Sequence, residues 1–318
     1  MANPDPKISV IIPVKGDWPH LEACVRSILN LNYLNFDIIV VDDGLSGEAI
    51  SSLEKYKNKM GILASGGKGP SYARNLAVKN TDAEFIAFTD SDCVVDKDWL
   101  INLFDGFKKN PGAVSCGGKQ ELPRDAGDFE KKVFLFMEKI GFLTDYLRRT
   151  RNNDIIEVNH NASCNVMYEK DVFLKEGGFL ESLWPGEDVE FDYRLARKKY
   201  KLVFSPKAIV YHCRPKDLKS FSKMMYRYGW AQGFLVKKYG IYRKIQFLPL
   251  IVCAAVIVLF LTLLFGFIIY SLLGIAIGLG VIFIYFKFDF TSIKLCILTL
   301  ARWHFGFLKG LLNFDKKS

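Results

Sequence analysis

The feature that most constrains this chain is a stretch of 42 residues, Ile245–Phe286, without a single Asp, Glu, Lys or Arg. An ordinary soluble domain rarely contains such a run, and about 20 apolar residues suffice for a helix to cross a bilayer. The stretch therefore predicts two membrane-spanning helices joined by a tight turn near Tyr270–Gly274. Basic residues stand at both ends, at Lys244 and Lys287, and positive charge favours the cytoplasmic side. An even number of crossings follows, as in a C-terminal transmembrane helical hairpin.

The segments on either side of this stretch mix basic residues with aromatic ones. Residues 215–244 combine Lys and Arg with Phe, Tyr, Trp and Met, and residues 287–318 carry a basic stripe on an otherwise apolar helix. This composition is typical of amphipathic helices that lie in the headgroup region of a membrane. A third membrane-spanning helix at residues 293–312 is the competing interpretation.

Charge is divided unevenly along the chain. Residues 1–212 contain 28 Lys and Arg against 31 Asp and Glu, a net charge of −3, whereas residues 213–318 contain 15 against 3, a net charge of +12. The positive excess therefore lies beside the hydrophobic stretch, where anionic lipid headgroups attract it. The first two thirds have no basic stripe with interleaved aromatics, so membrane lipids are the expected partner and nucleic acid is not.

The seven cysteines show no CxxC pairing and no zinc-ligand spacing, so we expect reduced and mostly buried thiols. The first residues lack the basic start and apolar run of a signal peptide. Residues 1–214 are therefore expected to form a cytoplasmic domain attached to the cell membrane by residues 245–286.

Within this domain, short apolar runs alternate with helical patterns. Strands are predicted at Ile8–Pro13, Phe36–Val41, 60–64 and Phe85–Thr89, separated by helices at Trp18–Asn30, 47–58 and 70–79. Such alternation is typical of an α/β fold with a parallel sheet and helices on both faces. In these folds ligands bind at the carboxyl ends of the strands.

The rest of the domain is less regular. Residues 120–160 form an insertion over the site, with a charged aromatic helix at Phe129–Arg149 and a polar turn at Arg151–Asp154. An acceptor-side lid and plain packing are equally open interpretations. Two further strands, Leu202–Phe204 and Ala208–His212, end the domain.

Two acidic turns follow predicted strands directly. Asp90 and Asp92 stand one residue apart after Phe85–Thr89, and two carboxylates at a strand end suit Mg²⁺ or Mn²⁺, which prefer oxygen ligands and retain substrate phosphates. Asp42 and Asp43 follow the second strand. One of them is expected to accept an N–H from a nucleobase and the other to cap the next helix, although a solvated turn is the alternative.

Three other patterns carry chemical groups. The glycine-rich entry to the helix at 70–79 suits an anion but is not a Walker A loop, and Arg74 is placed to pair with a nucleotide. The segment after Trp184 holds four carboxylates, at Glu187, Asp188, Glu190 and Asp192. One of them is a candidate general base, with a charged helix start as the alternative. His212, at the end of a strand, is a candidate third metal ligand.

Taken in order, these segments resemble the inverting family 2 glycosyltransferases, whose catalytic domain has the GT-A fold. The matching segments are ISVIIPV, VVDDG, GPSYARN, FTDSDC, the GGF turn, PGEDVEF and VYH, over roughly residues 7–235. The resemblance implies a Rossmann-like mixed sheet that binds a nucleotide-diphosphate sugar, followed by the C-terminal hairpin.

The resemblance also implies a role for each matching residue. It implies a nucleotide site lined by Pro13, Val14, Asp42, Asp43, Arg74, Asp90 and Ser91. It implies a site for Mn²⁺ or Mg²⁺ at Asp92, Asp90 and His212, with Asp92 as the direct ligand. Asp188 matches the catalytic base of the family. The acceptor-side candidates are Asn165, Glu187 and Trp184.

The implied activity is transfer of one sugar, with inversion, to a hydroxyl or phosphate of a membrane-associated, polyprenyl-linked acceptor. Processive synthases of the family carry Gln-x-x-Arg-Trp before their membrane segment, and Met224–Trp230 retains Arg227 but neither the Gln nor the adjacent Trp. A processive synthase is therefore the less favoured alternative. A non-catalytic nucleotide-sugar-binding subunit is another, and the intact acidic positions count against it.

Overall fold

The computed structural model describes residues 5–16, 18–142, 153–266, 268–287 and 289–312. The described chain divides into two compact units. The first, here called the sheet unit, comprises the residues up to Ala126 together with Met137–Arg214. The second, the helical unit, comprises Gly127–Phe136 and the residues from Pro215 onward. The short segment Gly127–Phe136 therefore clusters with the C-terminal helices although it lies in the middle of the sheet unit in sequence.

The sheet unit is built on nine strands. They are β1 (Ile8–Val14), β2 (Phe36–Asp42), β3 (Gly61–Ala64), β4 (Phe85–Thr89), β5 (Cys93–Val95), β6 (Ala113–Glu121), β7 (Ile156–Val158), β8 (Asn165–Glu169) and β9 (Lys201–His212). Their order is β3-β2-β1-β4-β8-β6-β9-β5, with β7 paired to β9. The first four strands in this order are parallel, and β8 enters antiparallel to both β4 and β6. The sheet is therefore mixed, as expected from the resemblance.

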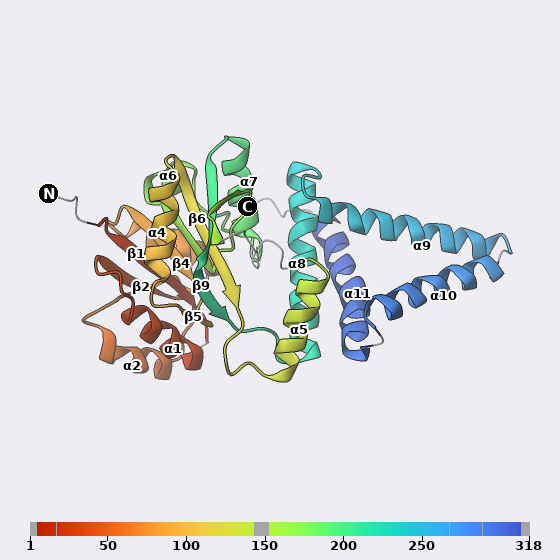
Figure 1. Cartoon of the computed structure of the whole chain (residues 1–318), viewed down its shortest axis with the longest axis horizontal. Coiled ribbons are helices and arrows are strands. Elements are labelled where there is room, and N and C mark those ends of the chain that lie inside the picture. Colours follow the sequence, from red (N-terminus) through yellow and green to blue (C-terminus); the bar gives the residue numbers. More distant parts are fainter. Residues whose placement is uncertain (1–4, 17, 143–152, 267, 288, 313–318) are drawn as a thin grey trace. The chain divides into compact units, whose positions relative to one another are not determined.

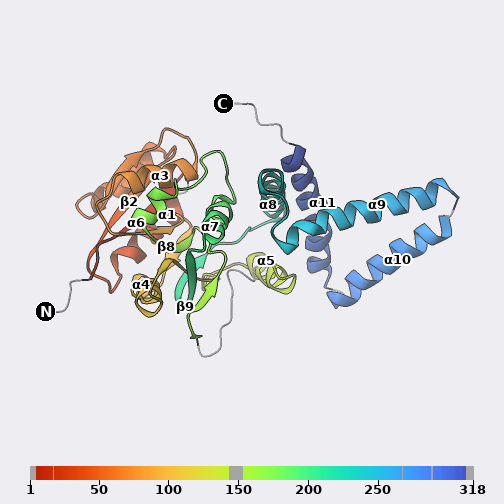
Figure 2. The same ribbon diagram turned by 90° about the horizontal axis from the view of Figure 1, so that it is seen from above.

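Helices cover both faces of this sheet (Figures 1 and 2). They are α1 (Trp18–Leu29), α2 (Gly47–Leu53) with the 3₁₀ turn η1 (Glu54–Tyr56), α3 (Pro70–Lys79), α4 (Trp99–Lys109), α6 (Lys170–Lys175) and α7 (Glu187–Arg197). Alternate residues of β1 enter two separate hydrophobic clusters, because successive side chains in a strand point to opposite faces. Val10 and Ile12 pack with α1 and α4, and Ile11 packs with α3 and α7.

One predicted pair of strands proves to be a single strand. The segments Leu202–Phe204 and Ala208–His212 were expected to be separate, yet β9 runs without a break from Lys201 to His212. Its pairing with β6 shifts between Gly118 and Lys119, where residues 206–208 are left out of the ladder. Because Pro206 has no N–H to donate, this bulge lets the strand continue past it.

The helix predicted at Phe129–Arg149 is shorter in the structure. It is α5 (Asp128–Lys139), followed by a turn at residues 140–142. Gly141 takes a φ of +73°, and the N–H of Phe142 donates to the carbonyl of Met137. A glycine in the left-handed region ends a helix in this way, so the predicted helix was too long. Residues 143–152, which include the start of the predicted turn, lie outside the described residues.

The helical unit contains α8 (Leu218–Tyr239), the 3₁₀ turn η3 (Lys244–Phe247), α9 (Leu248–Leu264), α10 (Ile268–Tyr285) and α11 (Phe290–Leu312). The helices α9 and α10 form the predicted hairpin. Its turn lies between Leu264 and Ile268, with Gly266 at a φ of +80°, rather than near Tyr270–Gly274. The predicted turn was misplaced, because Gly274 lies within α10 whereas Gly266 takes the left-handed conformation.

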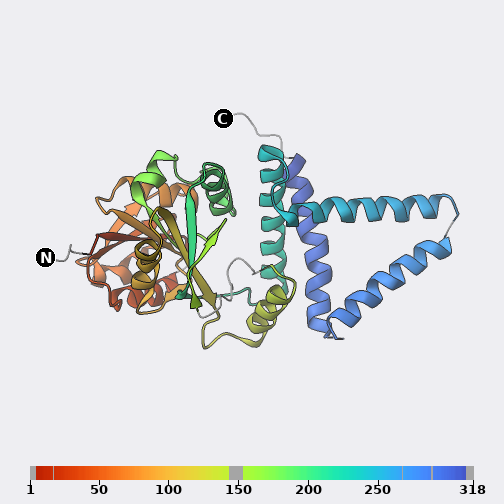
Figure 3. The ribbon, with the colours of Figure 1, turned by 45° about the horizontal axis from the view of Figure 1, so that its top comes forward.

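The helices α8 and α11 lie side by side and parallel (Figure 3). Two glycines on each helix form the contact, and they are Gly229 and Gly233 on α8 with Gly306 and Gly310 on α11. A Cβ atom added to any of the four would lie 2.0–2.1 Å from a backbone oxygen of the other helix. Only glycine permits so close an approach, which is the small-xxx-small type of helix packing.

Three described helices are long and apolar enough to cross a membrane. They are α9 with its preceding turn, α10 and α11, and their mean hydropathies are 3.0, 2.4 and 1.3. Of these, α11 is the least hydrophobic and the most buried within the protein. The stacked rings of Phe136 and Phe286, 5.6 Å apart, attach α5 to the end of α10.

Candidate active site

The two acidic turns lie at the same edge of the sheet. In the pairing of β1 with β2, Val14 stands opposite Asp42, and Ile11 stands opposite Phe88 of β4. The carboxyl ends of these three parallel strands therefore coincide. Pro13 and Val14, predicted to line the nucleotide pocket, are buried residues of β1 at this edge, and Val14 accepts a hydrogen bond from the N–H of Asp43.

The turn after β2 is held together by its own carboxylates. Asp42 Oδ1 accepts hydrogen bonds from the N–H groups of Gly44 (2.8 Å) and Leu45 (2.7 Å). Asp43 is buried, and its Oδ1 accepts from Ser65 Oγ (2.5 Å) and from the N–H of Gly69 (3.0 Å). Asp43 thus fastens the glycine-rich loop to this turn.

The expectation that one of these carboxylates caps the next helix is wrong. The N-cap of α2 is Ser46, whose hydroxyl accepts from the N–H of Ala49 at 3.2 Å. A hydroxyl at this position satisfies the open N–H groups of the first helical turn.

Arg74 lies beneath this edge in α3 with only 2% of its surface exposed. Its Nη1 donates to Glu187 Oε1 at 2.9 Å, and its Nη2 donates to Asp90 Oδ1 at 2.5 Å. One guanidinium therefore joins the turn after β4 to the start of α7. A buried charge needs such partners, because removing one of them leaves the other charge uncompensated.

Asp90, Asp92 and His212 come together as the sequence predicts. Each offers a ligand atom, and these atoms lie within 4.8 Å of one another. The Nε2 of His212 lies 3.4 Å from Asp92 Oδ1. Two carboxylates and an imidazole are a donor set that suits Mn²⁺ or Mg²⁺, so the residues fit a divalent cation.

The charges of Asp92 and His212 depend on each other. Burial opposes the charge on both groups, but their attraction outweighs it, which lowers the pKa of Asp92 and raises the pKa of His212 to about 10. The Nδ1 of His212 lies 3.1 Å from Gln120 Oε1, which also accepts from Arg214 Nη2 at 2.9 Å. A cation between the carboxylates would take over the charge now carried by the imidazolium.

Asp188, the predicted base, stands in the first turn of α7. Its Oδ2 accepts from the N–H of Ser163 at 2.9 Å. The neighbouring Glu187 accepts from Ser163 Oγ at 3.1 Å as well as from Arg74. Burial, followed by the charge of Asp188, raises the pKa of Glu187 to about 7, although Arg74 opposes the shift. Glu187 and Asp188 therefore hold the loop before β8 against the start of α7.

The other two carboxylates of this helix are structural. Arg194 donates to Glu190, with Nε–Oε distances of 3.0 Å. Asp192 is fully buried, where it accepts from the N–H of Asn161 (2.7 Å) and from Tyr168 Oη (2.8 Å). Local sequence gave no signal for these partners, because Asn161 and Tyr168 lie more than twenty residues away.

Two of the three acceptor-side predictions are corrected by the structure. Asn165 is fully buried, and its amide donates to the carbonyls of Lys119 and Ala208 and accepts from Trp99 Nε1. Glu187 is 2% exposed and bound as described above. Both side chains hold the protein together instead of facing an acceptor. Trp184, the third acceptor-side candidate, is 46% exposed. Ser91, which was predicted to line the nucleotide site, is 7% exposed.

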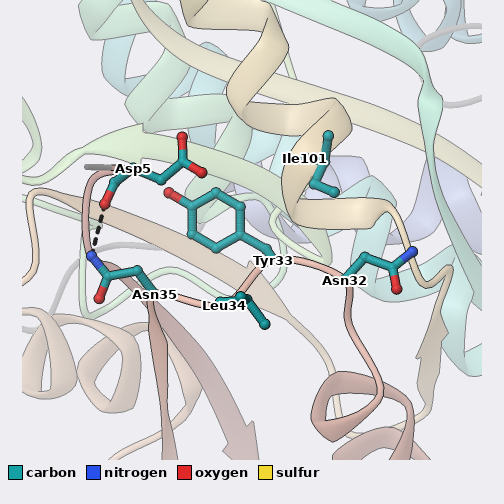
Figure 4. A pocket seen from close by; sticks show the side chains of 6 residues that line it. All are labelled: Asp5, Asn32, Tyr33, Leu34, Asn35 and Ile101. Carbon is teal, nitrogen blue, oxygen red and sulfur yellow. Dashed lines mark hydrogen bonds between the residues drawn. The ribbon is translucent and has the colours of Figure 1, made fainter. Parts of the chain in front are cut away.

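A hollow of about 380 Å³ lies elsewhere on the sheet unit (Figure 4). It is lined by Asp5, Asn32, Tyr33, Leu34, Asn35 and Ile101. These residues surround the amino ends of β1 and β2, opposite the edge that carries the acidic turns. The hollow is therefore separate from the candidate active site.

A family model and individual relatives match this chain, and all of them are described as glycosyltransferases or polysaccharide synthases. A family model described as "Glycosyl transferase family 2" matches residues 9–176. The poly-beta-1,6-N-acetyl-D-glucosamine synthase of Staphylococcus epidermidis is 22% identical over 231 residues, which are 71% of this chain and 54% of that protein. The poly(ribitol-phosphate) beta-N-acetylglucosaminyltransferase TarS of Staphylococcus aureus is 31% identical over 100 residues, 30% of this chain and 18% of that protein. The chain thus spans about half, or less, of these relatives.

Solved structures show the same fold. The mannosyltransferase PcManGT from Pyrobaculum calidifontis, in complex with GDP-Man and Mn²⁺, has a TM-score of 0.68 at 16% identity and covers 99% of this chain and 89% of its own. S. aureus TarS in complex with UDP-GlcNAc has a TM-score of 0.53 at 18% identity. The match covers 72% of this chain and 66% of the TarS chain.

The mixed sheet, with its acidic turns at one edge, is therefore that of the GT-A glycosyltransferases, followed by three apolar helices that could span a membrane. The chain belongs to glycosyl transferase family 2. The resemblance read from the ordered segments is confirmed at this level.

Proposed function

We propose that this protein transfers one sugar, with inversion, from a nucleotide-diphosphate sugar to a hydroxyl or phosphate of a membrane-associated acceptor. The observation that carries the proposal is the convergence of Asp90, Asp92 and His212 at the carboxyl edge of the sheet. Arg74 supports it, because one guanidinium contacts both Asp90 and the residue before Asp188.

The proposed cation site is Asp90, Asp92 and His212, and the expected ion is Mn²⁺ or Mg²⁺. Such an ion, when bound, neutralises the charge that develops on the diphosphate as the sugar leaves. Mn²⁺ is the first ion to test, because PcManGT was solved with it. Arg74 holds the Asp90 carboxylate in place through its Nη2, and is therefore proposed as a positioning residue and not as a nucleotide contact.

The proposed base is Asp188. It takes the proton of the acceptor hydroxyl as that oxygen bonds to the anomeric carbon, and the bond from this carbon to the diphosphate oxygen breaks at the same time. A single displacement of this kind inverts the anomeric carbon. The hydrogen bond from the Ser163 N–H holds the carboxylate in one orientation, which favours proton transfer to a positioned base.

The nucleotide is proposed to lie along the ends of β1 and β2. Asp42, with Pro13 and Val14, is proposed to contact the base, and Asp43 to shape the loop that passes the diphosphate. Candidate donors follow from the relatives: two act on or bind N-acetylglucosamine compounds, and PcManGT binds GDP-Man. UDP-GlcNAc and GDP-mannose are therefore the first donors to test.

The membrane arrangement is proposed from the helical unit. The helices α9 and α10 cross as a hairpin, whereas α8 and α11 lie together at the cytoplasmic surface. The close glycine contacts hold α11 against α8, so both helices are proposed to have the same position relative to the membrane. The helix α8 carries five basic residues: Lys219, Lys223, Arg227, Lys237 and Lys238. A helix with this many charges does not cross the hydrocarbon core. The acceptor is proposed to be anchored in the same membrane, as a polyprenyl-linked saccharide would be.

A processive synthase is the second candidate function, and the match to the S. epidermidis synthase favours it. The missing Gln and Trp before the membrane segment favour single transfer instead. Product length decides between them, because a synthase gives a distribution of long chains from one acceptor and a single-transfer enzyme gives one added sugar.

The experiment for the proposal is a panel of nucleotide sugars, incubated with the detergent-purified chain, Mn²⁺ and a crude lipid extract, with the released nucleotide as readout. One donor is expected to release its nucleotide in a lipid-dependent way. Asp188→Asn is expected to abolish transfer but retain nucleotide and Mn²⁺ binding. If Asp188→Asn loses binding instead, its role as base is wrong.

A further inference from the structure

The histidine of the proposed cation site belongs to a second group of potential ligands. Among the described residues, Cys93, Cys164 and His212 also offer one atom each within 4.8 Å of one another. Cys164 Sγ lies 3.8 Å from His212 Nδ1. Cys93 Sγ lies 4.0 Å from Asp92 Oδ1. Cys93 therefore stands directly beside a carboxylate of the proposed Mn²⁺ site.

The backbone fixes this arrangement. Cys93 opens β5 and is paired in register with His212 of β9. Cys164 immediately precedes β8, whose first residue, Asn165, is paired with Thr89 of β4. Three different strands thus bring the groups together, so the site exists before any ion arrives. Preformed donors bind a metal without the cost of ordering the chain.

The spacing suits a thiophilic cation. Zinc bonds of about 2.3 Å to sulfur and about 2.0–2.1 Å to nitrogen place tetrahedral donors roughly 3.5–3.8 Å apart. The 3.8 Å between Cys164 Sγ and His212 Nδ1 matches this value, and an ion at Nδ1 has to displace only the Gln120 side chain, whose Oε1 lies 3.1 Å away. Thiolate and imidazole select Zn²⁺ over Mn²⁺, and at most sites Zn²⁺ also binds more tightly. The two thiols are buried, but His212 is 18% exposed and gives an ion a route inward.

We propose that Cys93, Cys164 and His212 form a second metal site, for Zn²⁺ or a similarly thiophilic divalent cation, that is mutually antagonistic with the proposed Mn²⁺ site. Zn²⁺ displaces to solvent one proton from each thiol and the proton on Nδ1 of His212, and takes the place of Gln120 as the partner of Nδ1, on the opposite side of the ring from Asp92. Two divalent ions sharing one imidazole repel each other, so Zn²⁺ inhibits transfer. This inhibition rests on the proposed function, whereas the binding itself does not.

The binding is tested with Cd²⁺, whose bonds to thiolate produce a charge-transfer absorption in the ultraviolet. The full chain, purified in detergent with a non-chelating reductant, is titrated with Cd²⁺. One equivalent is expected to produce the band in the wild-type protein and in Cys116→Ser, a matched variant that removes a buried thiol elsewhere in the core. Cys164→Ser and Cys93→Ser are expected to lose it. A wild-type protein without the band, or a band unchanged in Cys164→Ser, overturns the site.

The antagonism is tested with the same four proteins. Zn²⁺ is expected to inhibit Mn²⁺-supported nucleotide release, and Cys164→Ser is expected to need at least roughly tenfold more Zn²⁺ for the same fractional inhibition, since it lacks one ligand. Equal Zn²⁺ sensitivity in a variant that has lost the Cd²⁺ band contradicts the antagonism. If the wild-type protein releases no nucleotide from any donor, the proposed function fails while the Cd²⁺ titration still decides the site.

Discussion

Two acidic turns stand at the ends of neighbouring parallel strands, and the structure uses them differently. After β2, Asp42 accepts hydrogen bonds from N–H groups of its own turn, and Asp43 accepts one from the N–H of Gly69. After β4, Asp90 and Asp92 face a buried guanidinium on one side and an imidazole on the other. The first turn shapes the backbone and the second presents charge. The same pattern of strand and paired carboxylates thus has two physical roles, and partners distant in sequence decide which.

The largest expected effect concerns the turn that presents charge. Asp92→Asn keeps the shape of the side chain but removes the charge that pairs with His212. We expect nucleotide release to fall by about 10²–10³-fold, the usual loss when one electrostatic group of an active site is removed. Steady-state rates measure the loss, and the thermal unfolding midpoint serves as control. An active Asp92→Asn enzyme would mean that the two turns do not differ as described.

The next effect concerns the support beneath that turn. Arg74→Met removes the cation shared by Asp90 and Glu187, so two carboxylates are left without compensation. We expect a loss of about 3–5 kcal/mol in the free energy of unfolding, the usual cost of breaking a buried ion pair. Denaturant unfolding measures it. The double variant Arg74→Met with Glu187→Gln, which also removes one charge, should recover part of the loss, and no recovery would contradict the pairing.

The turn that shapes the backbone should respond more weakly. Asp43→Asn weakens the hydrogen bonds from Ser65 and Gly69, a loss of about 1.5–3 kcal/mol for bonds to a charged group. We expect a raised KM for the donor with Mn²⁺ affinity unchanged, since the cation site does not involve this turn. Ser65→Ala, which removes one of the same bonds, is the matched control. A loss of Mn²⁺ affinity in either variant would show that the two turns act as one site.

The smallest effect is a pH dependence of stability. The pKa of Glu187 is raised from its ordinary value of 4.5 to about 7, so its contribution to stability is full below pH 4.5 and is lost as the pH rises through 7. Glu187→Gln resembles the protonated acid at every pH. The variant should therefore gain stability relative to the wild-type protein between about pH 5 and pH 8. Thermal unfolding midpoints across this range test the sign.

The alternation of short apolar runs and helical patterns predicted the parallel part of the sheet correctly. The strands β1, β2, β3 and β4 and the helices between them lie within a few residues of their expected places, because each apolar run forms one strand of a parallel unit. The continuity of β9 past Pro206 could not be predicted in this way, since it depends on a bulge against β6. The end of α5 at Lys139 was also missed, although Gly141 gave a signal for it.

The sequence indicated which carboxylates lie together at this edge of the sheet, but not the residues that surround them. Asp90, Asp92 and His212 do meet, and the order of the motifs was sufficient to find them. The partners of Arg74 could not be predicted from local pattern, because Glu187 lies 113 residues away in sequence. The burial of Asn165 was missed for the same reason: its partners are carbonyls of β6 and β9.

The most direct test of the account is Mn²⁺ binding with and without nucleotide. Titration of the protein with Mn²⁺, followed by the electron paramagnetic resonance signal of the free ion, gives the affinity. We expect one Mn²⁺ site, strengthened by the nucleoside diphosphate of the accepted donor and lost in Asp92→Asn but retained in Asp43→Asn. Mn²⁺ binding that survives Asp92→Asn with unchanged affinity would contradict it.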